Sequence, residues 1–138
     1  NLMSETRRPN DFLQEHFSLD CDHASTAASL TVKAGKLGRA FRIDRVTYIN
    51  PTGLAEDTAN NFKGEVKIGS TLVTQLFYTD SDEAGPNSLT ADTFITGSLS
   101  AVAGALNGAA EDTISLVLTK FGTQTLPAGK LRVEGRYL

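Results

Sequence analysis

Residues 40–51 read AFRIDRVTYINP and form the longest run in the chain with the pattern of one β-strand. Apolar side chains alternate with polar ones, first as Phe41 and Ile43 and then as Val46 and Tyr48. Alternation with a period of two is the pattern of a strand with one face buried. We therefore expect this run to be a strand in the middle of a sheet.

The apolar positions change from odd to even between Ile43 and Val46. A β-bulge near Asp44 and Arg45 would add one residue and return both apolar pairs to the same face. Alternatively, the strand crosses from one packing layer to another and is covered on different faces at its two ends. Pro51 ends the strand, because proline has no N–H to donate to a ladder.

Shorter runs with strand character follow the same rule and are separated by turn signals such as Gly69-Ser70. No long amphipathic helix lies between them, which argues against a βαβ arrangement. The sequence predicts an all-β fold, an antiparallel β-sandwich of jelly-roll type, with an immunoglobulin-like sandwich as the second choice. The further strands are expected over residues 28–34, 62–68, 71–79, 91–100, 113–120 and 131–137.

We expect two parts, an N-terminal arm over residues 1–22 and a single β-sandwich domain over residues 23–138. Asp11 can cap a short helix over residues 12–17. A helix of one or two turns cannot bury its apolar side chains alone, so the arm is expected to dock on a neighbour. The apolar residues of this short helix, which are the interface residues predicted in the arm, are Phe12, Leu13 and Phe17.

The last strand is expected to be an exposed sheet edge, because no covering segment follows it in the sequence. Exposed edges invite pairing with another chain. The interface residues predicted there are Leu131, Val133, Tyr137 and Leu138.

The composition is that of an ordinary globular domain. The chain has 138 residues, of which 40% are hydrophobic and 21% charged, and its formal net charge is −3. Basic residues are scattered, so a nucleic-acid partner is not expected. No run reaches the roughly 18 apolar residues of a membrane span, and residues 1–8 lack the apolar core of a secretory signal. Cys21 is the single cysteine, so the fold must rest on packing without an intrachain disulfide.

Two groups of residues invite a metal hypothesis. Asp80, Asp82 and Glu83 place Gly85 at the sixth position of a calcium loop, but alanine stands where the loop needs further oxygen ligands, so a solvated acidic turn is the better interpretation. The members of the second group lie within eight consecutive positions, 16–23, and their spacing matches no common zinc site. It consists of His16, Cys21 and His23, with Asp20 and Asp22 between them.

No catalytic motif is found. Cys21 beside His23 could suggest a thiolate nucleophile, but neighbours in sequence rarely form that pair. Residues 35–38, GKLG, lack the spacing of a phosphate-binding loop, and no nucleophile elbow is present. We therefore expect no enzyme activity, no catalytic residues, no metal and no cofactor.

The central run FRIDRVTYINPT, over residues 41–52, resembles small virion proteins of tailed bacteriophages. So do LVLTKFGT over residues 116–123, LPAG over residues 126–129 and GRY over residues 135–137. The resemblance runs from about residue 28 to the C-terminus. The family resembled is that of jelly-roll capsid cement or decoration proteins, of the kind seen on a Bordetella podovirus head.

The resemblance implies a non-enzymatic protein that binds the outer surface of an assembled HK97-like capsid and stabilises contacts between capsomers. It implies the major capsid protein as partner, self-association with a dimer favoured, manufacture in the host cytoplasm and a place on the outside of the virion. It implies no membrane partner. The alternative is a ligand- or carbohydrate-binding β-sandwich module of a phage fibre or tail, which would need exposed aromatic side chains or a true calcium loop.

Overall fold

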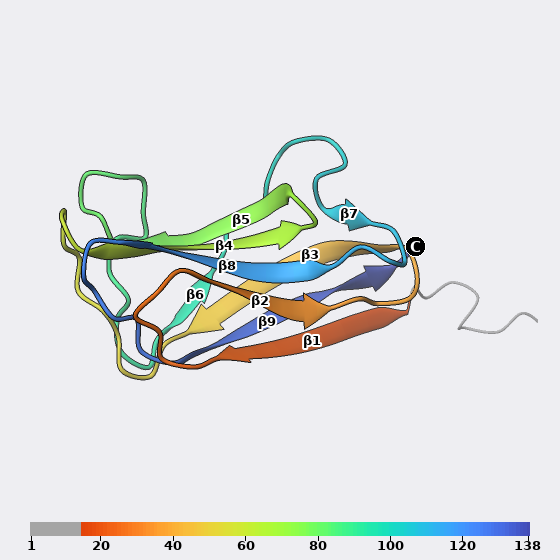
Figure 1. Cartoon of the computed structure of the whole chain (residues 1–138). Helices are drawn as coiled ribbons and strands as arrows, with labels where there is room; N and C mark the ends of the chain where they lie inside the picture. Colours follow the sequence, from red (N-terminus) through yellow and green to blue (C-terminus); the bar gives the residue numbers. More distant parts are fainter. Residues whose placement is uncertain (1–14) are drawn as a thin grey trace, which may run out of the picture.

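The computed structural model describes residues 15–138, which form two antiparallel sheets packed face to face (Figure 1). Residues 15–138 include no helix, and thus none with the length and hydropathy to cross a membrane. The strands are β1 His16–His23, β2 Leu30–Gly35, β3 Phe41–Ile49, β4 Asn61–Ile68, β5 Thr71–Tyr78, β6 Phe94–Thr96, β7 Asn107–Gly108, β8 Ile114–Phe121 and β9 Gly129–Tyr137.

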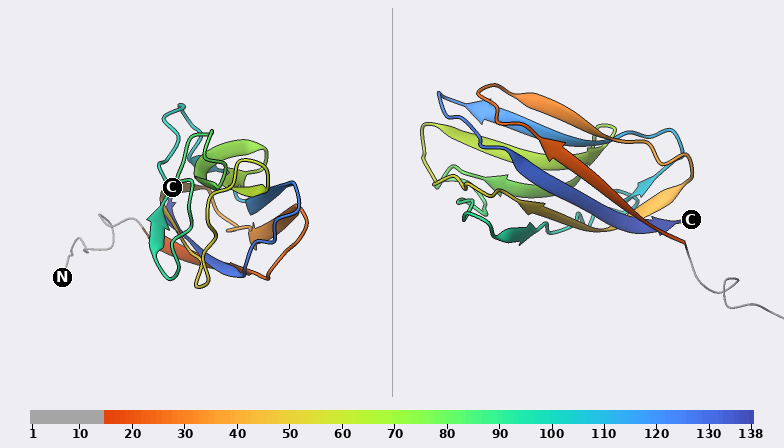
Figure 2. Two further views of the ribbon diagram at one scale, coloured as in Figure 1. Left: turned by 90° about the vertical axis from the view of Figure 1, so that its left-hand side faces the viewer. Right: turned by 90° about the horizontal axis from the view of Figure 1, so that it is seen from below.

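The strand order identifies the sandwich as a jelly roll. One sheet has the order β1-β9-β3-β6, with the two-residue β7 also paired to β3, and the other has the order β2-β8-β4-β5. The first half of the chain thus pairs with the second half in reverse: β1 with β9, β2 with β8, β3 with β6 and β4 with β5. A long hairpin rolled into two sheets has this connectivity. The prediction of an antiparallel jelly-roll sandwich is confirmed, and Figure 2 shows the two layers from the end and from below.

The bulge predicted in the central strand is present. The register between β3 and β9 shifts between Ile43 and Arg45, so Asp44 is the extra residue. Ile43 before the bulge and Val46 after it are both fully buried. Because the bulge restores parity, β3 keeps one face in the core along its whole length.

The core lies between the sheets and is rich in aromatic contacts. Phe17 of β1 meets Phe41 of β3 edge to face, with ring centroids 5.8 Å apart. Tyr48 reaches across the core to Phe77 of β5, at 5.2 Å. Aromatic pairs in such tilted and edge-to-face geometries add to the free energy gained from burial.

Gly135 fits where a side chain would not. A Cβ at this position would meet the backbone oxygen of Arg42 and lie 2.7 Å from the ring of Phe17. The absence of a side chain therefore lets Phe17 pack directly onto β9 beside β3.

The hairpin predicted at Gly69-Ser70 joins β4 and β5. Gly69 has a φ of +59°, whereas Ser70 has no positive φ. This combination is that of a type II′ turn, whose twist matches that of the flanking strands.

The predicted arm is wrong for residues 16–22. These residues belong to β1, which pairs with β9 from His16↔Arg136 to His23↔Gly129, so the sandwich begins at His16 and not at His23. The helix expected over residues 12–17 is wrong for His16 and Phe17, which are in the strand. Residues 1–14, including Phe12 and Leu13, lie outside the described residues.

The prediction that the last strand is a sheet edge is also wrong. β9 lies between β1 and β3 and pairs with both of them. Leu131 and Val133 are consequently buried in the core. Within the run predicted over residues 91–100, only the three residues of β6 are paired as a strand.

The place of β1 in the sheet leads to a prediction about truncation. Removing residues 1–14 should leave the free energy of unfolding of the monomer nearly unchanged, because both sheets lie within residues 15–138. Removing residues 1–22 also deletes Phe17 and Cys21 from the core and exposes the edge of β9. It should cost more than about 3 kcal/mol, the scale of one large core truncation. Chemical denaturation checks this, and equal stability of the two truncated chains would contradict it.

Candidate functional site

The outer face of the β1-β9-β3-β6 sheet is a patterned polar surface. Alternation along each strand points one set of side chains outward, and the register lines them up in rows across the sheet. One row runs Asp22, Lys130, Ile49, Phe94, and the next runs Asp20, Arg132, Thr47, Thr96. A third row runs Ser18, Glu134, Arg45.

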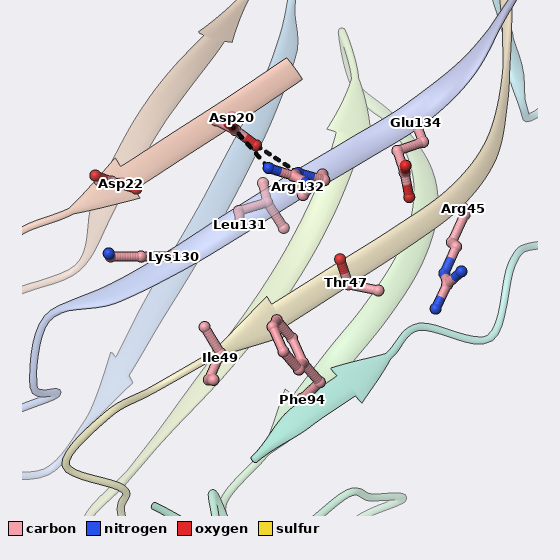
Figure 3. Close-up of a pocket in the computed structure, with 10 residues that line it drawn as sticks. All are labelled: Asp20, Asp22, Arg45, Thr47, Ile49, Phe94, Lys130, Leu131, Arg132 and Glu134. Carbon is pink, nitrogen blue, oxygen red and sulfur yellow. Dashed lines mark hydrogen bonds and ion pairs between the residues drawn. The ribbon is translucent and has the colours of Figure 1, made fainter. Parts of the chain in front are cut away.

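These rows line a shallow hollow of about 650 Å³ (Figure 3). Strands β1, β9, β3 and β6 all contribute to it, so residues far apart in the sequence meet on one surface. Because the hollow lies on the outside of a sheet, its floor is made of paired strands and is held in a fixed shape. We call it the β9 hollow, after the strand at its centre. It is lined by Asp20, Asp22, Arg45, Thr47, Ile49, Phe94, Lys130, Leu131, Arg132 and Glu134.

Acids and bases stand directly opposite one another in the β9 hollow. Asp20 accepts a hydrogen bond of 2.8 Å from Nε of Arg132, and this bond lowers the pKa of the Asp20 carboxyl. The register also sets Asp22 opposite Lys130 and Glu134 opposite Arg45, but among residues 15–138 neither of these two pairs closes to an ion pair. The acids and bases of the hollow cancel in formal charge, so net charge alone would not select its ligand.

One corner of the β9 hollow is apolar. Phe94 on β6 pairs with Ile49 on β3, and Phe94 remains 69% exposed. In Figure 3 both side chains stand at the edge of the charged rows. A large exposed aromatic side chain bordered by polar residues is typical of an interaction site.

The bulge in β3 shapes the charged surface next to the hollow. Asp44 and Arg45 are adjacent in sequence, yet both are exposed. Arg42 and Arg136 stand directly opposite each other on β3 and β9, and like charges in that position repel. The Asp44 carboxylate lies 3.8 Å from Nε of Arg42 and 3.5 Å from a terminal nitrogen of Arg136, so it offsets this repulsion.

A smaller hollow of about 230 Å³ lies where the loop over residues 100–107 covers Arg42. Nε of Arg42 is buried there without a hydrogen-bond acceptor in the described part of the chain. Val102 of this loop is 71% exposed.

The acidic loop after β5 is a structured turn. The Asn87 amide donates hydrogen bonds to the carbonyl oxygens of Tyr78, Asp80 and Glu83. The Asp80 carboxylate accepts from the backbone N–H of Asp82, which caps the turn. Across residues 15–138 no group of three or more His, Cys, Asp or Glu side chains is placed to hold a metal ion.

The strand geometry separates the residues of the second metal hypothesis. His16 is exposed, whereas Cys21 and His23 face the core. Burial raises the pKa of the Cys21 thiol, which opposes formation of a thiolate.

His23 belongs to a buried hydrogen-bond network. Its Nδ1 lies 2.9 Å from the carbonyl oxygen of Ala24, which only accepts, so Nδ1 carries the proton. Nε2 then accepts from the Tyr48 hydroxyl, at 2.7 Å. The Asn50 amide donates to the same hydroxyl oxygen and to the carbonyl of Pro127. Burial raises the pKa of Tyr48 to about 12 and lowers the pKa of His23.

The structure brings some of the predicted interface residues together, but inside the molecule. Phe17 packs on Tyr137, with ring centroids 5.6 Å apart, and the Arg39 guanidinium lies 4.4 Å from the centre of the same Tyr137 ring. Tyr137 is half-buried and Leu138 is exposed. An interface role stays a prediction for these two residues, while the side chains of Phe17, Leu131 and Val133 have almost no free surface.

Among the residues of the β9 hollow, the sequence marks Asp20 and Asp22 only beside a possible metal group and Leu131 only as an interface residue, and no local pattern predicts that they meet on one surface. Phe94 falls within the strand expected over residues 91–100, and Arg132 and Glu134 alternate with the apolar residues of the strand expected over residues 131–137. The available signal was an aromatic residue in a run of polar and small residues. The matching of Asp20 with Arg132 depends on register and has no local signature.

The buried network predicts a pH dependence of stability. Because the folded-state pKa of His23 lies below 6.5, the unfolded chain binds more protons there. The contribution of His23 to the free energy of unfolding should therefore be at its maximum above about pH 6.5. It should decrease as the pH falls towards the folded-state pKa. Protonation would also make Nε2 a donor and leave the Tyr48 proton without an acceptor.

Denaturant titrations between about pH 7 and about pH 5 check this prediction, because carboxylates titrate mainly below that window. His23→Gln should lower stability at every pH and remove the His23 step, whereas the exposed His16→Gln serves as the control and should keep it. An unchanged pH slope in His23→Gln would count against the assignment.

No protein-family model matches the chain, and no curated protein matches it. Among solved structures, the chain is similar to a chain in the structure of infectious bursal disease virus, Gx strain, with 12% sequence identity and a TM-score of 0.29. The alignment covers 91% of this chain and 37% of that chain, so this chain spans little more than a third of the length of the viral one. A likeness with so low a TM-score carries no argument, and the fold assignment rests on the strand order and register described above.

Proposed function

We propose that this chain is a virion structural protein of a tailed bacteriophage, which binds the outer surface of an assembled HK97-like capsid and stabilises contacts between capsomers. The supporting observation is the jelly-roll connectivity, in which the core is packed with side chains and the surfaces open to a partner are the sheet faces and loops. This architecture agrees with what the sequence resemblance implies for residues 28–138.

A sheet face suits such a role because it is a rigid surface. β9 is hydrogen-bonded on both sides, and β3 is paired with β9, β6 and β7. A surface that does not have to be ordered on binding loses less conformational entropy. Many copies on one shell can then act together, so each contact needs only modest affinity.

On this proposal the partners are the major capsid protein and further copies of this chain, with a dimer as the favoured oligomer. The protein would be made in the host cytoplasm and would remain on the outside of the virion. It would act by binding, with no chemical step.

A ligand- or carbohydrate-binding module of a phage fibre or tail is the second candidate. The β9 hollow favours it, because an exposed aromatic ring beside carboxylates, a guanidinium and a hydroxyl is a combination that can recognise a sugar. Saturable binding of a glycan, with loss of binding in Phe94→Ala, would support this candidate over the capsid role.

Co-sedimentation with empty heads of the phage whose genome encodes the chain tests the capsid role. We expect saturable binding with a fixed number of copies per capsomer, and a higher temperature of head disruption, because a ligand that binds only the assembled state stabilises it. Heads of an unrelated phage are the control and should not bind. Protein that stays in the supernatant at every concentration would overturn the proposal.

A further inference from the structure

We propose that the β9 hollow is a docking site for residues 1–14 of a second copy of this chain. This inference deepens the proposed function, since it concerns how copies contact each other. Self-association is measured without heads, so the two can fail separately.

The apolar corner of the hollow indicates that its occupant is partly apolar. Phe94 is 69% exposed on an edge strand of only three residues, and its neighbour across the pair, Ile49, is half-buried. An aromatic side chain left open beside a charged surface resembles an anchor of a protein interface, and such apolar anchors give most of the affinity. The occupant must therefore bring an apolar side chain of its own.

The charge pattern of the hollow indicates what charges its occupant carries. Asp22, Glu134, Lys130 and Arg45 line the hollow, and none of them is in an ion pair among residues 15–138. Two acids and two bases select an occupant that carries charges of both signs. A uniformly acidic or basic ligand would meet as much repulsion as attraction.

Residues 1–14 fit both requirements. They read NLMSETRRPNDFLQ, with Glu5 and Asp11 balanced by Arg7 and Arg8. Apolar side chains occur near both ends of the segment, including Phe12 and Leu13. The sequence thus offers aromatic, aliphatic, acidic and basic groups within one short stretch.

The shape of the hollow favours a chain segment over a second sheet face as its occupant. The hollow is concave, so two copies cannot fill it by laying this face against itself. A chain segment is convex enough to enter it. Segments of about 14 residues span about 46 to 50 Å when extended, at roughly 3.3 to 3.6 Å per residue.

The direction in which β1 begins favours a segment from a second copy over the segment of the same copy. The carbonyl of Glu15 accepts a hydrogen bond from the N–H of Tyr137, so the pairing of β1 with β9 continues up to Glu15. The centre of the hollow lies beside Asp20, five residues further along β1, about 17 Å away at roughly 3.3 Å per residue. Phe12 and Leu13 stand only three and two residues before Glu15, or roughly 7 to 11 Å of extended chain, which is too short to bring them back to the centre of their own hollow. The same residues of a neighbour have no such constraint.

Sedimentation velocity of the full chain over a range of concentrations tests the proposal. Wild type should self-associate, and Phe94→Glu and the double substitution Phe12→Ser with Leu13→Ser should each raise the dissociation constant roughly tenfold or more. Val102→Ser is the matched control, because Val102 is equally exposed but lies outside the hollow, and it should leave association unchanged. At protein concentrations below the wild-type dissociation constant, thermal unfolding should be the same for Phe94→Glu and wild type, which separates loss of docking from loss of fold.

A synthetic peptide of residues 1–14 provides the second measurement. It should dissociate the wild-type oligomer and should not bind Phe94→Glu. The proposal is overturned by a wild-type chain that is monomeric at all concentrations, or by association that persists in Phe94→Glu. It is also overturned if Phe94→Glu loses binding to heads while self-association is intact, because the occupant is then a capsid segment.

Discussion

The insertion of β9 between β1 and β3 is the constraint on which the rest of this structure depends. It joins the beginning, the middle and the end of the chain into one sheet, with eight residue pairs to β1 and eight to β3. The bulge at Asp44 allows this insertion, because without the shift β3 would turn its second half away from the core. Gly135 then lets Phe17 of β1 lie against β9, so that backbone pairing and side-chain packing support each other.

The same insertion creates the candidate site. The outward side chains of β9 are Lys130, Arg132 and Glu134. They stand between the outward side chains of β1 and those of β3. The side chains on either side of Arg132 are Asp20 and Thr47, which are separated from it by most of the chain. A surface assembled in this way is as rigid as the sheet beneath it, which suits recognition by contact.

Much of the fold could be predicted because its signals are local. The parity change in residues 40–50 indicates a bulge, since a strand with one buried face has few other ways to accommodate it. Gly69 indicates the turn between β4 and β5 because only glycine adopts its backbone conformation without strain. β1 carried the same kind of signal, with Phe17, Leu19, Cys21 and His23 alternating against polar residues. The cysteine and the histidine of this run also suggest metal ligands, which hides the fact that both are core residues of a strand.

Strand order and the candidate site could not be predicted from the sequence, because both depend on long-range pairing. The alternation in residues 131–137 is the same whether the strand lies at an edge or in the centre, because its outward face is polar in either case. Only the partners on each side distinguish the two, and they are fixed by long-range pairing. The β9 hollow depends on the same pairing, so no local pattern marks Phe94 or Arg45 as parts of one surface.

The late position of β9 has a consequence for how each subunit is synthesised. β1 and β3 cannot be hydrogen-bonded into one sheet until residues 129–137 have emerged from the ribosome, and until then both strands have unpaired edges. Folding can therefore be completed only after β9 has been translated. Until then, nascent chains on one messenger RNA have unpaired strand edges and can pair with each other. A cell that makes many copies in a short time would depend on closing this sheet quickly, before adjacent unfinished chains associate.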